Sequence, residues 1–219
     1  MSLIDDLSQR GDELRAQVRR MLERHQYSTT TKGVMLVAYV DLALEHHAAI
    51  WLLRERELFG SAFALVRPLY DTVFRALWIG AKATDEQVEQ ASRDDLDWLR
   101  IPLLDDIKQV YFGAQALNDA GLAQAADEFF KGMKKLMKVL HSYTHPGLRQ
   151  LGRRFTAYQV KPSYHKRDIA GGLNLSTFAL MFLMQGFFAI MQAKRESDEV
   201  QALLTQYVHD FTQRVQEGV

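Results

Sequence analysis

Apolar residues recur every three to four positions along almost the whole chain, which is the spacing of one face of an α-helix. The first helix shows the pattern at Leu3, Leu7, Leu14, Val18 and Leu22. No stretch shows the strict apolar–polar alternation of a half-buried β-strand. The pattern therefore predicts an all-α fold.

Glycine, proline and hydroxyl residues interrupt the pattern and divide the chain into about seven to eight helices, because these residues cap helices or cannot continue them. The predicted helices span residues 3–22, 31–58, 62–83, 85–99, 102–117, 122–142, 173–194 and 196–216. Arg67 precedes Pro68, where we expect the third helix to start or kink. No repeat or long linker divides the sequence, so residues 1–219 are predicted to form a single helical-bundle domain.

One uncharged segment, residues 169–193, matches the ~20 apolar residues that cross a bilayer. It also contains Asn174 and Gln185, and it lacks the flanking aromatic residues of a membrane interface. A fully buried helix at the centre of a bundle has the same composition. We therefore expect helix 173–194 to be the central apolar helix, and we expect no membrane partner.

The composition excludes several kinds of chemistry. The sequence has no cysteine, and so no disulfides, thiolate metal sites or cysteine nucleophiles. The first residues include acidic side chains where a secretory signal begins with basic ones, so we predict a cytoplasmic protein. No phosphate-binding glycine-rich loop, G-x-S-x-G, H-E-x-x-H or paired E-x-x-H motif occurs. No cofactor is predicted, and whether the chain is an enzyme stays open.

The charges are unevenly distributed, although the formal net charge is zero. Residues 84–128 contain eleven Asp or Glu and three Lys or Arg, whereas residues 131–167 contain ten Lys or Arg and no Asp or Glu. Two explanations fit equally well. One face binds an anionic partner, or the basic part of the molecule neutralises its own acidic part.

The basic segment begins on helix 122–142, whose lysines and core residues lie on opposite faces. We define the basic ridge as Lys131, Lys134, Lys135, Lys138, His141 and His145. Arg149, Arg153 and Arg154 follow in the next loop.

An RNA or nucleotide site is the first interpretation of this region. His145 would transfer a proton, His141 could replace or assist it, and Arg149 would stabilise the phosphate. The residues that would position the backbone are Lys134, Lys138, Arg153 and Arg154. The tyrosines that could stack bases are Tyr143, Tyr158 and Tyr164.

Two other interpretations stay open. His-x-x-x-His places two imidazoles on one helical face, as in some metal sites, but the lysines disfavour a cation and a third ligand would have to come from elsewhere. We therefore predict no metal ligands. The other interpretation is a purely structural one, a solvated helix end whose cations bind backbone carbonyls or the acidic segment.

Charged residues also occur inside apolar helices. Asp41 and Glu45 lie one turn apart in a helix that is apolar almost all round, so we expect both to be buried and to need partners. Arg67, Asp71 and Arg75 follow at intervals of four on the next helix. They form either a structural ladder between the helices, which is the more common arrangement, or a charged ligand pocket.

Three segments, SAFALVRPLYDTVFRALWI, LHSYTHPGLRQLGRRF and GGLNLSTFALM, together resemble a bacterial all-helical family of unknown function. Its members carry an Arg-x-x-x-acid segment followed by Arg and Trp, then a His-Gly element, then an Asn before an apolar helix. The resemblance implies that the family positions are Arg67, Asp71, Arg75, His145, Gly147 and Asn174. Asp71 stands where a glutamate is expected, and Pro146 separates the histidine from the glycine. The likeness implies a fold but no activity.

The chain is more distantly similar to HEPN domains, helical bundles that often act as dimeric ribonucleases in toxin and phage-defence systems. Their signature, an Arg followed four to six residues later by His, occurs here as Arg19 or Arg20 with His25. We predict a homodimer that binds RNA or another phosphate-bearing ligand, with ribonuclease or toxin activity as its enzymatic version. The alternatives are a non-enzymatic protein-interaction module and a histidine-based metal-binding bundle.

Overall fold

The computed structural model describes residues 3–93, 104–112, 118–145, 147–154 and 159–216. In chain order the helices are α1 (Leu3–Arg24), α2 (Thr31–Glu55), α3 (Phe59–Ala81), α4 (Asp85–Ser92), α5 (Leu104–Phe112), α6 (Ala120–Thr144), α7 (Leu148–Leu151), the 3-10 turn η2 (Gly152–Arg154), α8 (Lys166–Ile190) and α9 (Lys194–Gln216). The described residues contain no strand, and the predicted all-α bundle is confirmed.

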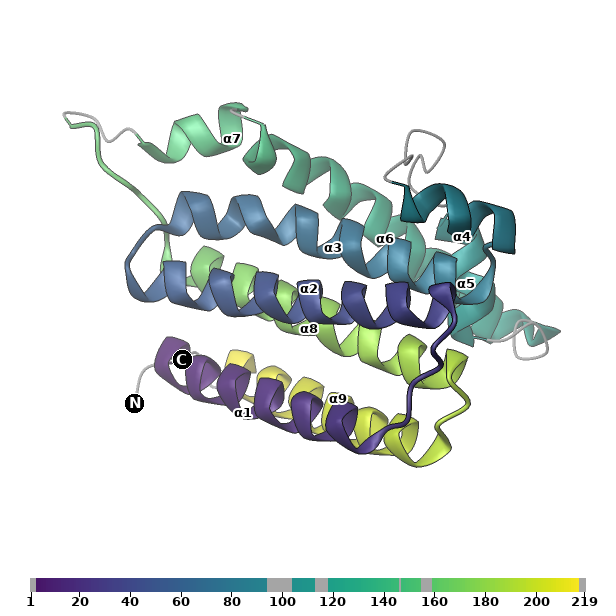
Figure 1. The fold of residues 1–219 in the computed structure, drawn as a ribbon. Helices are drawn as coiled ribbons and strands as arrows, with labels where there is room; N and C mark the ends of the chain where they lie inside the picture. The colour runs from purple at the N-terminus through teal and green to yellow at the C-terminus, as the bar shows by residue number, and fades with distance from the viewer. Residues whose placement is uncertain (1–2, 94–103, 113–117, 146, 155–158, 217–219) are drawn as a thin grey trace.

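The helices form an elongated bundle (Figure 1). α2, α3 and α8 run side by side through its middle, and α3 packs against α2, α6 and α8. α1 and α9 lie along one side, whereas α6 and α7 lie along the other. The short helices α4 and α5 sit at the end where α3 finishes. This layering leaves the outer side of α6 facing solvent.

α8 is the central apolar helix, as predicted, and most residues between Ile169 and Phe188 are buried. It begins at Lys166 rather than near residue 173, because Gly171 and Gly172 lie inside the helix. A Cβ atom on Gly172 would lie 1.9 Å from Cε1 of Phe63. The glycine therefore allows α8 to approach α3 closely and does not interrupt the helix.

α2 is much less buried than its apolar sequence predicts. Asp41 and Glu45 are exposed, so the expectation that they are buried carboxylates in need of partners is wrong. On the same stripe, Val34 and Leu52 are each 57% exposed. The reason is that α2 packs through its other side only. The buried residues of α2 are Gly33, Leu36, Val40, Ala43, Leu44, His47, Ile50 and Trp51.

Two of the described helices, α2 and α8, are long and apolar enough to cross a membrane by length and composition. In α8 67% of the apolar window is buried inside the protein, compared with 39% in α2. The burial of α8 is what a core helix of a bundle shows.

The ends of α3 and α6 determine where the charged residues lie. α3 begins at Phe59 and continues through Pro68, so of the two predictions for the proline, a helix start or a kink, the start is wrong. α6 begins where the Asp119 carboxylate accepts a hydrogen bond from the Leu122 N–H at 2.8 Å. It ends at His145, which adopts an extended conformation with φ −100° and ψ 141°. The residue before a proline disfavours the helical conformation, which explains this end.

Candidate functional site

The lysines of the basic ridge all lie on the exposed side of α6, as the helical pattern predicts. The buried residues on the opposite side are Ala126, Phe130, Met133, Met137 and Leu140. Within the described part of the chain, no ion pair links Lys131, Lys135 or Lys138 to a carboxylate. At a rise of 1.5 Å per residue, the row from Lys131 to His145 extends about 21 Å. The ridge is therefore an extended, solvent-facing row of positive charge.

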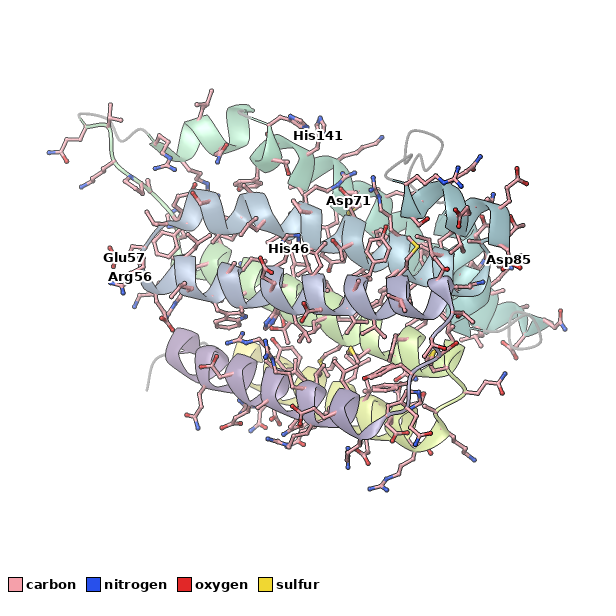
Figure 2. All side chains as sticks on the ribbon, viewed as in Figure 1. His46, Arg56, Glu57, Asp71, Asp85 and His141 are labelled. Carbon is pink, nitrogen blue, oxygen red and sulfur yellow. The ribbon has the colours of Figure 1, made fainter. Side chains whose placement is uncertain are left out.

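His141 and His145 complete the ridge at the C-terminal end of α6, where Figure 2 labels His141. Both side chains are exposed, and their ring centroids are 4.3 Å apart. The two imidazoles are thus close enough to contact one small group together. Among the residues that the structure describes, no set of three or more His, Asp or Glu side chains could hold a metal ion.

The arginines beyond the ridge have different environments. The Arg149 side chain lies outside the described part of the structure. Arg153 forms a 2.7 Å ion pair with Asp168 in the first turn of α8. Asp168, the first carboxylate after the acid-free segment 131–167, thus neutralises Arg153, one of the predicted phosphate-binding cations. Arg154 instead lies against Gly60 at the start of α3.

The tyrosines predicted to stack bases pack against protein. The rings of Tyr143 and Tyr164 each have centroids 5.4 Å from that of Phe63. Tyr158 lies outside the described residues. Tyr143, at the end of α6, and Tyr164, before α8, therefore contribute to the packing against α3, and they give no support to base stacking.

Arg67 joins α3 to α6. Its Nε donates to Asp71 Oδ2 at 2.9 Å, and its Nη1 donates to the Met137 carbonyl oxygen at 2.8 Å. Asp71 is thus the carboxylate partner of Arg67, whereas Asp41 and Glu45 are exposed on α2. Among the described residues, no hydrogen bond or ion pair connects this pair to His141 or His145.

Two further positions from the family resemblance have unsatisfied polar atoms. Arg75 Nε and Asn174 Oδ1 are buried and find no hydrogen-bond partner among the described residues. Gly147 has a clearer role, since a Cβ there would lie 2.4 Å from Ser142 Oγ. The glycine lets the chain turn back onto the end of α6, directly after the histidines.

A buried polar centre that the sequence does not reveal lies between α1, α2 and α8. His47 is completely buried, with Nδ1 2.9 Å from Arg15 Nη1 and Nε2 3.2 Å from Thr177 Oγ1. The Arg15 guanidinium and the Trp51 indole, whose Nε1 lies 3.1 Å from Nε2, can only donate, so they compete for the single acceptor nitrogen of a neutral imidazole. The Thr177 hydroxyl can either donate or accept, so it suits Nε2 in both tautomers. Burial, with a smaller contribution from Arg15, lowers the pKa of His47 to about 3.

This centre could not be recognised from the sequence because His46 and His47 are adjacent, and nothing local shows which of them faces the core. The half-buried His46 also has a lowered pKa, chiefly because of burial. A neutral imidazole held by a cation and a threonine stabilises the contact between helices and offers no open position for a ligand.

The residues of the HEPN-like signature lie in different surroundings. The His25 ring packs against Tyr27 and Phe188, with centroid distances of 5.4 and 6.1 Å. Arg19 is exposed, and Arg20 lines an open groove of about 650 Å³ between α1 and α9. The Arg24–Glu199 ion pair, at 2.9 Å, lies in this groove.

Comparison with known proteins assigns the chain to a family. Residues 40–213 match the model of a family described as "Family of unknown function (DUF6988)", and the chain belongs to this family. The resemblance to an all-helical family of unknown function is confirmed. No curated protein and no solved structure matches the chain.

Proposed function

We propose that this member of the DUF6988 family binds the phosphate backbone of RNA through the basic ridge. The observation that carries the proposal is the row of exposed lysines on α6, three of which have no carboxylate partner among the described residues. Lysine and arginine side chains that neutralise phosphates release condensed counterions, which drives binding. A solvent-facing row of about 21 Å presents several cations to one strand at the same time.

The binding should depend little on base sequence. Recognition of single-stranded RNA bases requires aromatic faces or hydrogen-bonding groups that reach the bases. Tyr143 and Tyr164 pack against Phe63 instead. The ridge therefore offers charge without base readout, and homopolymers of different sequence should bind with similar affinity.

Cleavage is a second candidate activity, and the contact between His141 and His145 favours it. Two exposed imidazoles with ring centroids 4.3 Å apart could serve as base and acid. One would remove the proton of a ribose 2′-hydroxyl as its oxygen attacks phosphorus, and the other would protonate the departing 5′-oxygen. The lysines would hold the phosphate during this step.

Fluorescence anisotropy with a labelled 20-nucleotide RNA, measured over a series of salt concentrations, tests the binding proposal. Four lysine contacts predict a slope of log K against log salt of about −3, since each phosphate contact on a single strand contributes about −0.7. Lys131→Glu combined with Lys138→Glu should remove most binding, because both side chains are exposed and their reversal leaves the core untouched.

The matched control is Arg19→Glu with Lys194→Glu, which makes the same change in net charge at exposed positions on α1 and α9. We expect this control to bind RNA nearly as well as the unmodified protein. Equal loss in both variants would show that overall charge, not the ridge, attracts RNA. Absence of binding by the unmodified protein at low salt would reject the proposal in favour of a protein-interaction module.

Single substitutions His141→Ala and His145→Ala test cleavage. In a nuclease each should reduce the cleavage rate by about 10²–10⁴-fold while RNA affinity changes little. Unchanged cleavage in both variants would assign the activity to another residue or to a contaminant. No cleavage by the unmodified protein would leave a binding protein without this chemistry.

We also propose that the chain forms a homodimer in the cytoplasm, as expected from its likeness to HEPN domains and from its composition. Light scattering after size-exclusion chromatography distinguishes a dimer from the 25.2 kDa monomer. A monomer at all concentrations would reject the dimer.

A further inference from the structure

Three segments meet at the end of the bundle where α3 and α8 both begin (Figure 1). A Cβ atom on Gly60, in the first turn of α3, would lie 2.5 Å from Arg154 Nη2 and 3.2 Å from the Tyr164 hydroxyl oxygen. The Gln150 side-chain amide donates to the Gly60 carbonyl oxygen at 3.3 Å, which holds α7 beside this turn. Gly60, Arg154 and Tyr164 define the end cluster.

The charge of Arg154 is unfavourable at this place. The N-terminus of a helix carries partial positive charge, which favours an anion and disfavours a cation. α3 begins after Leu58, which provides no side-chain cap, and its first turn contains no acidic residue. A guanidinium therefore lies against the positive end of an uncapped helix of 23 residues.

The second observation is that one polar group of the end cluster, the Tyr164 hydroxyl, is buried without a hydrogen-bond partner within the described part of the chain. Among the described residues, Arg154 makes no ion pair with Glu57, which precedes α3, or with Asp168, which is paired with Arg153. Buried polar groups without partners are rare and call for an explanation, such as an ion or ligand.

The cationic groups that meet here can only donate hydrogen bonds, and the Tyr164 hydroxyl can also donate. A guanidinium and backbone N–H groups have no lone pair to offer, and burial raises the pKa of Tyr164, so its hydroxyl stays protonated and can donate. What this arrangement lacks is an acceptor with several lone pairs and negative charge. A phosphate group matches that description, because its oxygens accept from a planar guanidinium fork and from helix N–H groups together.

We infer that the end cluster binds the dianionic phosphate of a phosphomonoester, with the Arg154 guanidinium, the Tyr164 hydroxyl and the first N–H groups of α3 as donors. A phosphodiester carries only one negative charge and offsets the two positive sources less well. The same chemistry could come from the 5′-phosphate of an RNA or from a free nucleotide or phosphate. The RNA source rests on the proposed function, whereas binding of phosphate itself does not.

Inorganic phosphate is the first probe, added to the full chain at constant ionic strength. Isothermal titration calorimetry should detect one site, and 10 mM phosphate should raise the unfolding midpoint by roughly 3 °C if the dissociation constant is near 1 mM. Arg154→Gln should abolish both effects, and Tyr164→Phe, which keeps the packed ring, should weaken binding about tenfold. Arg167→Gln removes an exposed cation near the start of α8 and should change neither effect.

Undetectable phosphate binding by the unmodified protein would overturn the inference, as would equal affinity of the Arg154→Gln and Arg167→Gln variants. If Arg154→Gln does not fold, Tyr164→Phe decides, and an unchanged affinity in that variant would overturn the inference.

RNAs of one sequence with a 5′-phosphate or a 5′-hydroxyl identify the source. If the 5′-phosphorylated RNA binds about tenfold more tightly, and Arg154→Gln loses this preference, the ligand is the terminal phosphate of RNA. If the two RNAs bind equally while inorganic phosphate still binds, the ligand is a free nucleotide or phosphate. Lys131→Glu with Lys138→Glu should weaken RNA binding but leave the affinity for inorganic phosphate unchanged. This variant separates a failure of the ridge from a failure of the end cluster.

Discussion

Acidification should destabilise the fold through His47. This side chain is completely buried, and the lowering of its pKa to about 3 comes chiefly from burial and to a lesser degree from the adjacent Arg15 guanidinium. In the unfolded chain the same imidazole has a pKa of about 6.5. Between these two values the unfolded chain binds a proton that the folded protein cannot accept. The stabilisation is therefore complete above about pH 6.5 and is lost as the pH falls toward 3.

The magnitude at a given pH follows from the difference in proton binding. A pH of 5 is about 1.5 units below the pKa of the unfolded imidazole, and each unit corresponds to about 1.4 kcal/mol. The free energy of unfolding is therefore about 2 kcal/mol lower at pH 5 than at neutral pH. This figure depends only on the unfolded pKa as long as the folded pKa lies well below 5. It is a substantial share of the ~5–15 kcal/mol that stabilises a typical domain.

Urea unfolding at pH 7.5 and pH 5.0 measures the effect, with His47→Gln as the comparison. Glutamine retains an oxygen that can accept from Arg15 but has no titrating group. Every other titratable group is common to the two proteins, so the difference between their pH dependences isolates His47. We expect the unmodified protein to lose about 2 kcal/mol more than His47→Gln on acidification.

Equal losses in the two proteins would refute the reasoning, since they would mean that His47 takes up a proton as readily when folded as when unfolded. Nuclear magnetic resonance provides a direct check. The His47 ring signals should stay at the neutral position down to pH 5.

Two packing predictions follow from the contacts of α3. Arg67→Ala should lower the free energy of unfolding, measured in urea, by about 1–2 kcal/mol. This is less than the ~3–5 kcal/mol of a fully buried pair, because the Asp71 side chain is 29% exposed and can be hydrated once it loses its partner. An unchanged stability would show that the pair contributes nothing. Gly172→Ala should cost about 1–3 kcal/mol, because the new Cβ would lie 1.9 Å from the Phe63 ring. Gly171→Ala is the control, since nothing lies within 4 Å of its Cβ position, and it should be neutral or stabilising by up to ~1 kcal/mol. Similar effects of both glycine substitutions on thermal unfolding would contradict the close approach of α8 to α3.

The helical composition of the protein and the face of α6 that carries the lysines could be predicted from the sequence. Both depend on local properties, namely the 3.6-residue period and the residues that cap or interrupt helices. The same local signals misplaced the start of α8. Gly171 and Gly172 look like a break, yet Gly172 is a contact point between two helices. Whether a glycine ends a helix or lets another helix approach depends on a neighbour that is far away in the sequence.

The environments of the charged residues were predicted less well. Asp41 and Glu45 stand in an apolar helix, and only the packing shows that their stripe faces solvent. The sequence predicts a ladder of charged residues but does not show which carboxylate pairs with Arg67, and the structure shows that it is Asp71.

The sequence by itself determined that the chain is all-helical, that α8 forms its centre and that one helix carries a row of cations, because periodicity and composition are properties of each segment alone. Only the tertiary structure decided that His47 is buried against Arg15, that Arg153 is paired with Asp168 and that Arg154 lies at the start of α3 beside Tyr164. The pattern of a helix shows which residues share a face, but burial, charge pairing and pKa depend on which other helix covers that face. That choice is made by contacts between segments distant in the sequence.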